Sequence, residues 1–106
     1  MNILLVNSEG PDAVGLRVMR DAVQQYWKDA KITTIVPRDA DPWGSITMRH
    51  PNLYAIQQDD LEKREPGFFI VDGCSASDVV DLAFLRQDWF GPPNKSLDLV
   101  CMGVTA

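Results

Sequence analysis

The chain has few of the residues that support metal binding, thiol chemistry or membrane attachment. It contains two cysteines, Cys74 and Cys101, without CxxC spacing, and a single histidine, His50. No apolar run approaches the roughly 20 residues of a membrane helix, and no basic segment followed by an apolar stretch begins the chain. We therefore expect a cytoplasmic protein with two free, buried thiols, since a reducing compartment keeps cysteines unpaired.

Basic charge is also scarce. The 10 Lys and Arg residues are outnumbered by 15 Asp and Glu residues, which gives a net charge of −5. Because nucleic-acid and anionic membrane surfaces attract basic faces, neither is an expected partner.

Glycine-rich phosphate-binding motifs and hydrolase motifs are missing. The turn after the first apolar run holds only Gly10 and matches neither a P-loop nor a dinucleotide fingerprint. Ser45 and Ser75 do not lie in G-x-S-x-G, so a hydrolase triad is not expected.

The apolar residues that are present predict one α/β domain over residues 1–106. Hydrophobic residues make up 45% of the sequence, which suits one small core. Short apolar or β-branched runs predict strands over 2–6, 31–37, 68–72 and 97–104. An S-x-x-D box begins a helix at Ser75.

An earlier helix is predicted over 12–27, and Asp12 is its expected N-cap. Its apolar stripe comprises Leu16, Met19, Val23 and Tyr26. Residues 45–56 are predicted to form a small hairpin arm, and residues 57–67 are predicted to form a solvated loop. Strands that alternate with helices predict a three-layer, Rossmann-like fold with a mostly parallel sheet. Sites in such sheets lie at the carboxyl ends of the strands.

Four ordered blocks carry a family resemblance. MNILLVNSEGPDAVGLRVMRDAV resembles the start of the SurE family of metal-dependent 5′/3′-nucleotidases, which has an apolar strand, N-D-D-G and I-x-A-P-G-I. ITTIVPRDADPWGSITMRHP resembles its V-x-V-V-A-P, Q-S-G-x-G and S-I-T-L segments. VDGCSASDVV is similar to V-x-G-T-P-A-D-C-V, and LDLVCMGVT to P-D-L-V-V-S-G-I-N. The resemblance implies a SurE-like core without the family's later half.

In the SurE family one divalent cation is held by the paired aspartates of N-D-D-G, the serine of Q-S-G and the asparagine of S-G-I-N. In this chain Ser8 and Glu9 stand at the aspartate pair, Pro42 at or near the serine, and Thr105 at the asparagine, while Asn7 is retained. A hard cation prefers several oxygen ligands, and only Glu9 is anionic. The resemblance therefore implies a degenerate site without catalytic residues and without a bound metal.

The simplest role for this turn is structural. Asn7 would tie the end of the first strand to a neighbouring loop, and Gly10 would permit the turn. Ser8 and Glu9 would favour the N-terminus of the following helix.

Two functional alternatives remain open. One is a weak nucleoside monophosphate phosphatase that uses Mn²⁺ or Mg²⁺ bound by Asn7, Glu9, Thr105 and either Asp39 or Asp41. The other is a metal-free binder of nucleotides or other anions at the helix N-terminus, which the charge of Glu9 opposes.

The leading interpretation is a catalytically inactive SurE-like protein that binds another protein or itself, with a homodimer expected. An exposed edge beside the last strand favours pairing, and small degenerate relatives of enzymes occur in phages as modulators of host proteins. Because Trp, Tyr and Arg anchor interfaces most often, the expected contact residues are Trp43, Arg49, His50, Tyr54, Trp89 and Phe90.

Overall fold

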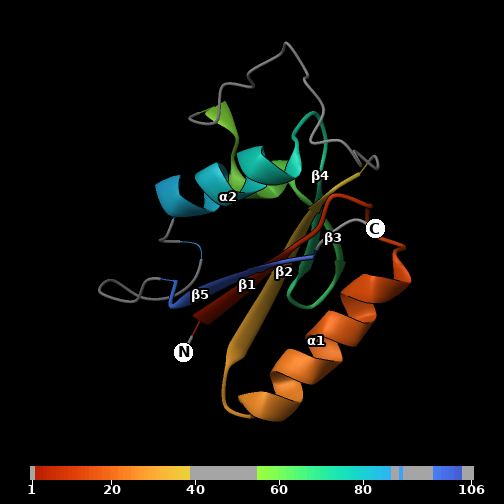
Figure 1. Cartoon of the computed structure of the whole chain (residues 1–106). Coiled ribbons are helices and arrows are strands. Elements are labelled where there is room, and N and C mark those ends of the chain that lie inside the picture. The colour runs from red at the N-terminus through yellow and green to blue at the C-terminus, as the bar shows by residue number, and fades with distance from the viewer. Residues whose placement is uncertain (1, 39–54, 87–88, 90–96, 104–106) are drawn as a thin grey trace.

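A computed structural model describes residues 2–38, 55–86, 89 and 97–103. The described residues form one sheet with a helix on each face, which confirms the predicted α/β class (Figure 1). The elements in chain order are β1 (Asn2–Val6), α1 (Val14–Tyr26), β2 (Lys31–Pro37), a 3₁₀ helix (Gln58–Asp60), β3 (Glu62–Glu65), β4 (Phe68–Val71), α2 (Ala76–Leu85) and β5 (Leu99–Met102).

The sheet has five strands in the order β3-β4-β2-β1-β5. The pairs β1–β2, β1–β5 and β2–β4 are parallel, and β3 is antiparallel to β4. Leu4 of β1 lies between Thr33 of β2 and Val100 of β5. The central strand therefore connects the two halves of the sheet.

Each face of the sheet has its own apolar cluster, because side chains alternate along β1. Ile3 and Leu5 pack with Leu16 and Val23 of α1 on one face. Leu4 and Val6 pack on the other face with α2 residues, which include Val79 and Ala83. The predicted three-layer arrangement is confirmed.

Two expectations for α1 are wrong. Asp12 is not the N-cap; the helix begins after Ala13, which has no side chain that can cap. Tyr26 is 77% exposed, although Leu16 and Val23 of the same predicted stripe are buried. The predicted stripe averages fewer residues per repeat than the ~3.6 residues of a helical turn, so Tyr26 lies roughly 80° around the helix from Leu16 and is turned away from the sheet.

The expected start of α2 is confirmed. The Ser75 hydroxyl accepts a hydrogen bond from Asp78 N at 3.2 Å, and the Asp78 carboxylate accepts one from Ser75 N at 2.9 Å. This capping box satisfies two backbone donors that helical bonding leaves without partners.

The expectation of a loop over 57–67 is wrong, because this segment contains β3 as an antiparallel edge strand. All four of its residues are charged and exposed, so the strand shows no alternation of apolar and polar residues. Pro66 and Gly67 form the turn into β4, and Gly67 adopts the positive φ of 77° that this turn requires. The Pro-Gly pair is the sequence signal for this hairpin.

The predicted arm over 45–56 lies outside the described residues, except for Ala55 and Ile56, which belong to no strand. Both cysteines are free, as expected, but half-buried rather than buried. Burial and the nearby carboxylates of Asp78 and Asp72 raise the pKa of Cys74 to about 11. Among the described helices, none has the length and apolar character to cross a bilayer.

Removal of the α2 cap is expected to destabilise the fold. Ser75→Ala should lower the free energy of unfolding by about 1 kcal/mol, because Asp78 N loses its acceptor. Urea denaturation measures the change, and Ser77→Ala, at an exposed position in the first turn of the same helix, is the matched control. Equal effects of the two substitutions would contradict the capping role.

The raised pKa of Cys74 predicts slow alkylation. At pH 8 the thiolate fraction is small when the pKa is about 11, so Cys74 should react with iodoacetamide on the order of a hundredfold more slowly in the folded chain than in urea. The rate should rise with pH until the pH passes the folded pKa. Peptide mass spectrometry follows Cys74 separately from Cys101, and an equal rate in both states would contradict this prediction.

Candidate functional site

The turn after β1 is closed by Asn7, whose side chain is only 4% exposed. Asn7 Nδ2 donates a hydrogen bond to Gly10 O at 2.9 Å, and Gly10 N donates one to Asn7 Oδ1 at 3.3 Å. Gly10 has a φ of 97°, which glycine adopts at low cost. Asn7 thus ties the end of β1 to the turn that directly follows this strand. The sequence predicted a bond from Asn7 to a neighbouring loop, but it did not identify Gly10 as the partner.

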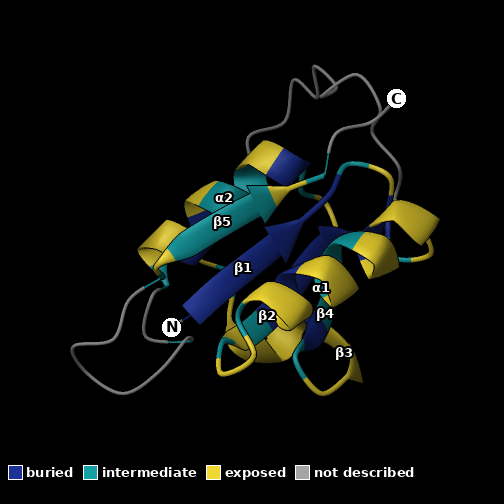
Figure 2. Cartoon of the chain, turned by 60° about the horizontal axis from the view of Figure 1, so that its bottom comes forward, coloured by how far each residue is buried: buried dark blue, intermediate teal, exposed yellow. Residues whose placement is uncertain are grey.

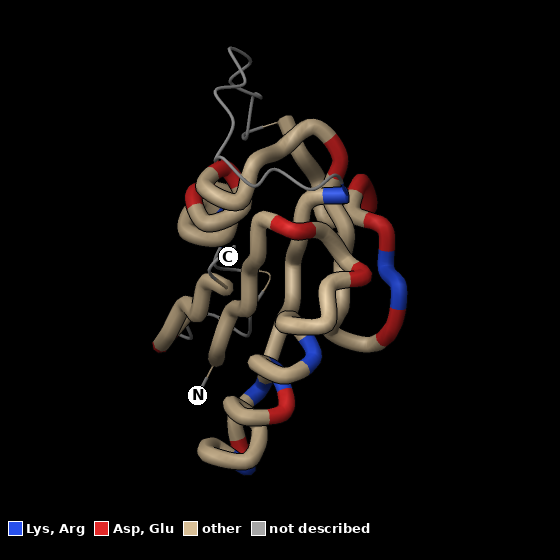
Figure 3. Tube along the Cα trace, turned by 45° about the vertical axis from the view of Figure 1, so that its right-hand side comes forward, with Lys and Arg blue, Asp and Glu red and all other residues tan. Residues whose placement is uncertain are grey.

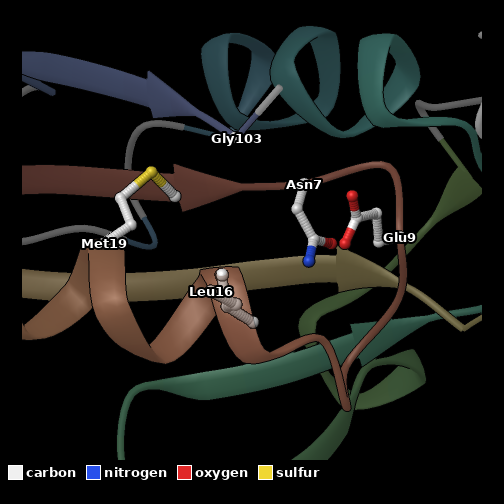
Figure 4. A pocket seen from close by; sticks show the side chains of 6 residues that line it. Asn7, Glu9, Leu16, Met19 and Gly103 are labelled. Carbon is white, nitrogen blue, oxygen red and sulfur yellow. The ribbon is translucent and has the colours of Figure 1, made fainter. Parts of the chain in front are cut away.

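A pocket of about 170 Å³ lies beside this turn, at the carboxyl ends of β1 and β5 (Figure 4). Its described lining residues come from three places in the chain: Asn7, Glu9, Gly15, Leu16, Met19 and Gly103. The α1 residues supply an apolar wall, and Gly103 leaves space because it has no side chain. The position agrees with the rule that parallel sheets hold their sites at strand carboxyl ends.

The chemistry of the pocket is limited by its single charge. Glu9 is exposed and is the only ionisable side chain among the described lining residues. The Asn7 amide is already hydrogen-bonded within the turn. Within the described part of the chain no three His, Cys, Asp or Glu side chains are grouped to hold a metal ion. The described residues therefore do not fit a divalent cation, which needs several oxygen ligands.

The expected role of Ser8 and Glu9 at the N-terminus of α1 stays a prediction. α1 begins at Val14 and has no acidic residue in its first turn. Ser8 is half-buried in the turn after β1, and Glu9 lines the pocket. Glu9 shares this pocket with Gly15 and Leu16 of the first turn of α1.

A charged group that the sequence did not predict lies at the carboxyl ends of β2 and β4. Arg38 Nε donates to Asp72 Oδ1, and Arg38 Nη2 donates to Glu62 Oε1 at 2.9 Å. These two carboxylates raise the pKa of Arg38 above its ordinary value. The guanidinium is therefore engaged by carboxylates of β3 and of the loop after β4. Arg38 follows the predicted strand 31–37 and Asp72 ends the predicted strand 68–72, which is the only sequence signal for this contact.

Most other predicted site residues lie outside the described residues: Pro42, Trp43, Arg49, His50, Tyr54, Phe90 and Thr105, together with Asp39 and Asp41. Trp89 is described and half-buried, with the Arg86 guanidinium 5.8 Å from its ring centroid. Its ring packs against the α2-side cluster. Trp89 thus belongs to the core periphery.

The fold and the pocket position are those of a Rossmann-like α/β chain. It is 36% identical over 104 residues to "5′-nucleotidase SurE" of Campylobacter fetus subsp. fetus (strain 82-40), an alignment that covers 96% of this chain and 35% of the relative. The crystal structure of SurE protein from Aquifex aeolicus superposes with a TM-score of 0.67 at 22% identity, over 97% of this chain and 37% of that one. No protein-family model matches.

These comparisons confirm the predicted resemblance and the Rossmann-like fold. The chain spans about one third of the length of the relatives that it matches. Most of each relative therefore has no counterpart in this chain.

The Asn7 turn is expected to stabilise the fold. Asn7→Ala should lower the free energy of unfolding by about 1–3 kcal/mol, because both Gly10 backbone groups lose a buried partner. Asn7→Asp keeps an acceptor for Gly10 N but no donor for Gly10 O, so its loss should be intermediate. Urea denaturation ranks the variants, and an unchanged Asn7→Ala midpoint would contradict this role.

Proposed function

We propose that this chain is a catalytically inactive SurE-like protein that acts by binding another protein chain. The observation that carries the proposal is an uncharged, half-buried strand, β5, that among the described strands pairs only with β1, in a chain that also exposes apolar residues of α1. Exposed apolar surface and a strand edge without charged side chains each favour association with a second chain.

The apolar surface of α1 is the first support. Val14 and Val18 are 78% and 63% exposed, and Tyr26 is also exposed. With Ala22 they repeat every four residues, so they form a stripe that winds slowly along the helix. Arg20, on the other flank, bonds Glu65 of β3 at 2.8 Å. The stripe therefore lies off the flank that faces β3, on a helix whose ribbon is largely exposed in Figure 2.

The pocket is the second support, because it suits neither alternative activity. A phosphatase of the SurE type needs a cation, and the described oxygen donors here are one exposed carboxylate and an amide engaged in the turn. Anion binding is opposed by the same carboxylate, since Glu9 would repel phosphate at close range. The proposal therefore includes no metal or other cofactor. In this proposal the protein is located in the cytoplasm and binds a protein partner, as a phage modulator of a host protein would.

Phosphate release tests the absence of catalysis. With a nucleoside monophosphate and millimolar Mn²⁺ or Mg²⁺, the protein should release no phosphate above the buffer rate, and its melting temperature should not rise, because a ligand that binds only the folded state would raise it.

Two matched substitutions make this result decisive. Glu9→Gln removes the carboxylate of the pocket, and Asp29→Asn removes an exposed carboxylate in the loop after α1. Phosphate release that depends on metal and is lost in Glu9→Gln but kept in Asp29→Asn would overturn the proposal.

A further inference from the structure

A groove of about 230 Å³ lies between α1 and the β3–β4 hairpin. Its described lining residues come from both elements: Leu16, Arg17, Arg20 and Asp21 of α1, with Glu65 and Phe68 of the hairpin. Leu16 and Phe68 are buried and form an apolar floor. The other four side chains are charged, two of each sign. This hairpin groove therefore combines an apolar floor with a rim that has no net charge.

The hairpin supplies one wall of this groove. Glu65 lies opposite Phe68 in the antiparallel pair, after an irregularity between Lys63 and Glu65. Opposite residues of an antiparallel pair share a face of the sheet, and Phe68 packs in the cluster on the α1 face. Glu65 therefore faces α1, where its Oε1 accepts a hydrogen bond from Arg20 Nη1 at 2.8 Å. In Figure 3 acidic and basic residues follow one another along β3, and both signs also occur on α1.

The α1 wall carries a second pair of opposite charges. Arg17 and Asp21 are four residues apart, so they lie on one flank of the helix with about 5–6 Å between their Cβ atoms. Both side chains are exposed, and neither forms an ion pair or a side-chain hydrogen bond with another described residue. Helical pairs are favoured with the acidic residue first, and here the order is reversed. Arg17 and Asp21 can therefore both bind the charges of a ligand.

The size and charge of the hairpin groove favour a small ligand that carries both signs. Pockets for drug-sized molecules measure roughly 300–1,000 Å³, so a groove of about 230 Å³ suits a smaller molecule. A simple anion would be repelled by Asp21 and Glu65 at short range, and a simple cation by Arg17 and Arg20. A zwitterion meets both signs at once. An apolar side chain on the same ligand would cover the apolar floor.

We propose that the hairpin groove binds a free α-amino acid with an apolar side chain. Arg17 donates hydrogen bonds to the α-carboxylate, and Asp21 accepts one from the α-ammonium group, in charge-assisted contacts. The side chain of the ligand lies on Leu16 and Phe68. The groove shares only Leu16 with the described lining of the pocket beside Asn7. This inference therefore goes beyond the proposed function and does not depend on it.

Titration with L-leucine tests the ligand class. Backbone amide shifts in two-dimensional NMR spectra should change saturably at Arg17, Asp21 and Glu65. Three related compounds each lack one group: N-acetyl-L-leucine the ammonium, L-leucinamide the carboxylate, and glycine the apolar side chain. Each should bind roughly 2- to 10-fold more weakly than L-leucine. Equal binding of L-leucine and any one of the three would overturn the proposal.

Matched substitutions test the two charged contacts. Arg17→Gln and Asp21→Asn should each weaken L-leucine binding by a similar factor, and both positions are exposed, so folding should be retained. Lys28→Gln and Asp29→Asn remove charges of the same signs in the loop after α1 and should leave binding unchanged. Circular dichroism is the folding control. Unchanged affinity in Arg17→Gln or Asp21→Asn, or equal losses in the loop variants, would overturn the proposal.

The phosphate assay separates this inference from the proposed function. A chain that shows no shift with L-leucine at tens of millimolar would overturn the amino-acid site and leave the absence of phosphatase activity untouched. A chain that binds L-leucine through Arg17 and also releases phosphate through Glu9 would overturn the absence of catalysis and leave the amino-acid site in place.

Discussion

The fold depends on the complete burial of β1. Its residues lie between two parallel strands and two apolar clusters, so every side chain and every backbone group must find a partner inside the protein. The turn that follows is constrained in the same way. Asn7 is buried at the point where the strand pairing stops, and its amide supplies the bonds that the sheet no longer provides. The pocket beside this turn is thus a product of the way the central strand ends.

The sequence predicted the parts of the fold that rest on apolar pattern. β1, β2 and β4 are short apolar or β-branched runs, and α2 begins with a capping box, so local signals and tertiary structure agree there. β3 was missed because a strand made only of charged residues has no buried face to reveal it. The Pro66-Gly67 turn sets its pairing with β4, and ion pairs such as Arg64 with Asp12 join it to the segment before α1. Such contacts join residues distant in sequence.

The position of the candidate site could be predicted from the sequence, but the residues that line it could not. The apolar run before Asn7 places a turn at the end of a strand, where α/β proteins hold their sites. The apolar wall from Leu16 and Met19 could not be foreseen, because it depends on the rotation of α1 about its axis. Nor could the contact of Arg38 with Asp72 and Glu62, since it requires the strand order of the sheet. Strand order is set by crossovers, which leave no local pattern.

The charged β3 edge has a consequence for the size that any assembly of this chain can reach. A sheet with two open edges can add copies without limit and grow into a fibre, because each addition exposes a new edge. Here Glu62, Lys63, Arg64 and Glu65 occupy one edge, and Arg20 and Asp12 tie that strand to the body of the protein. Addition of further strands at the β3 edge is therefore disfavoured.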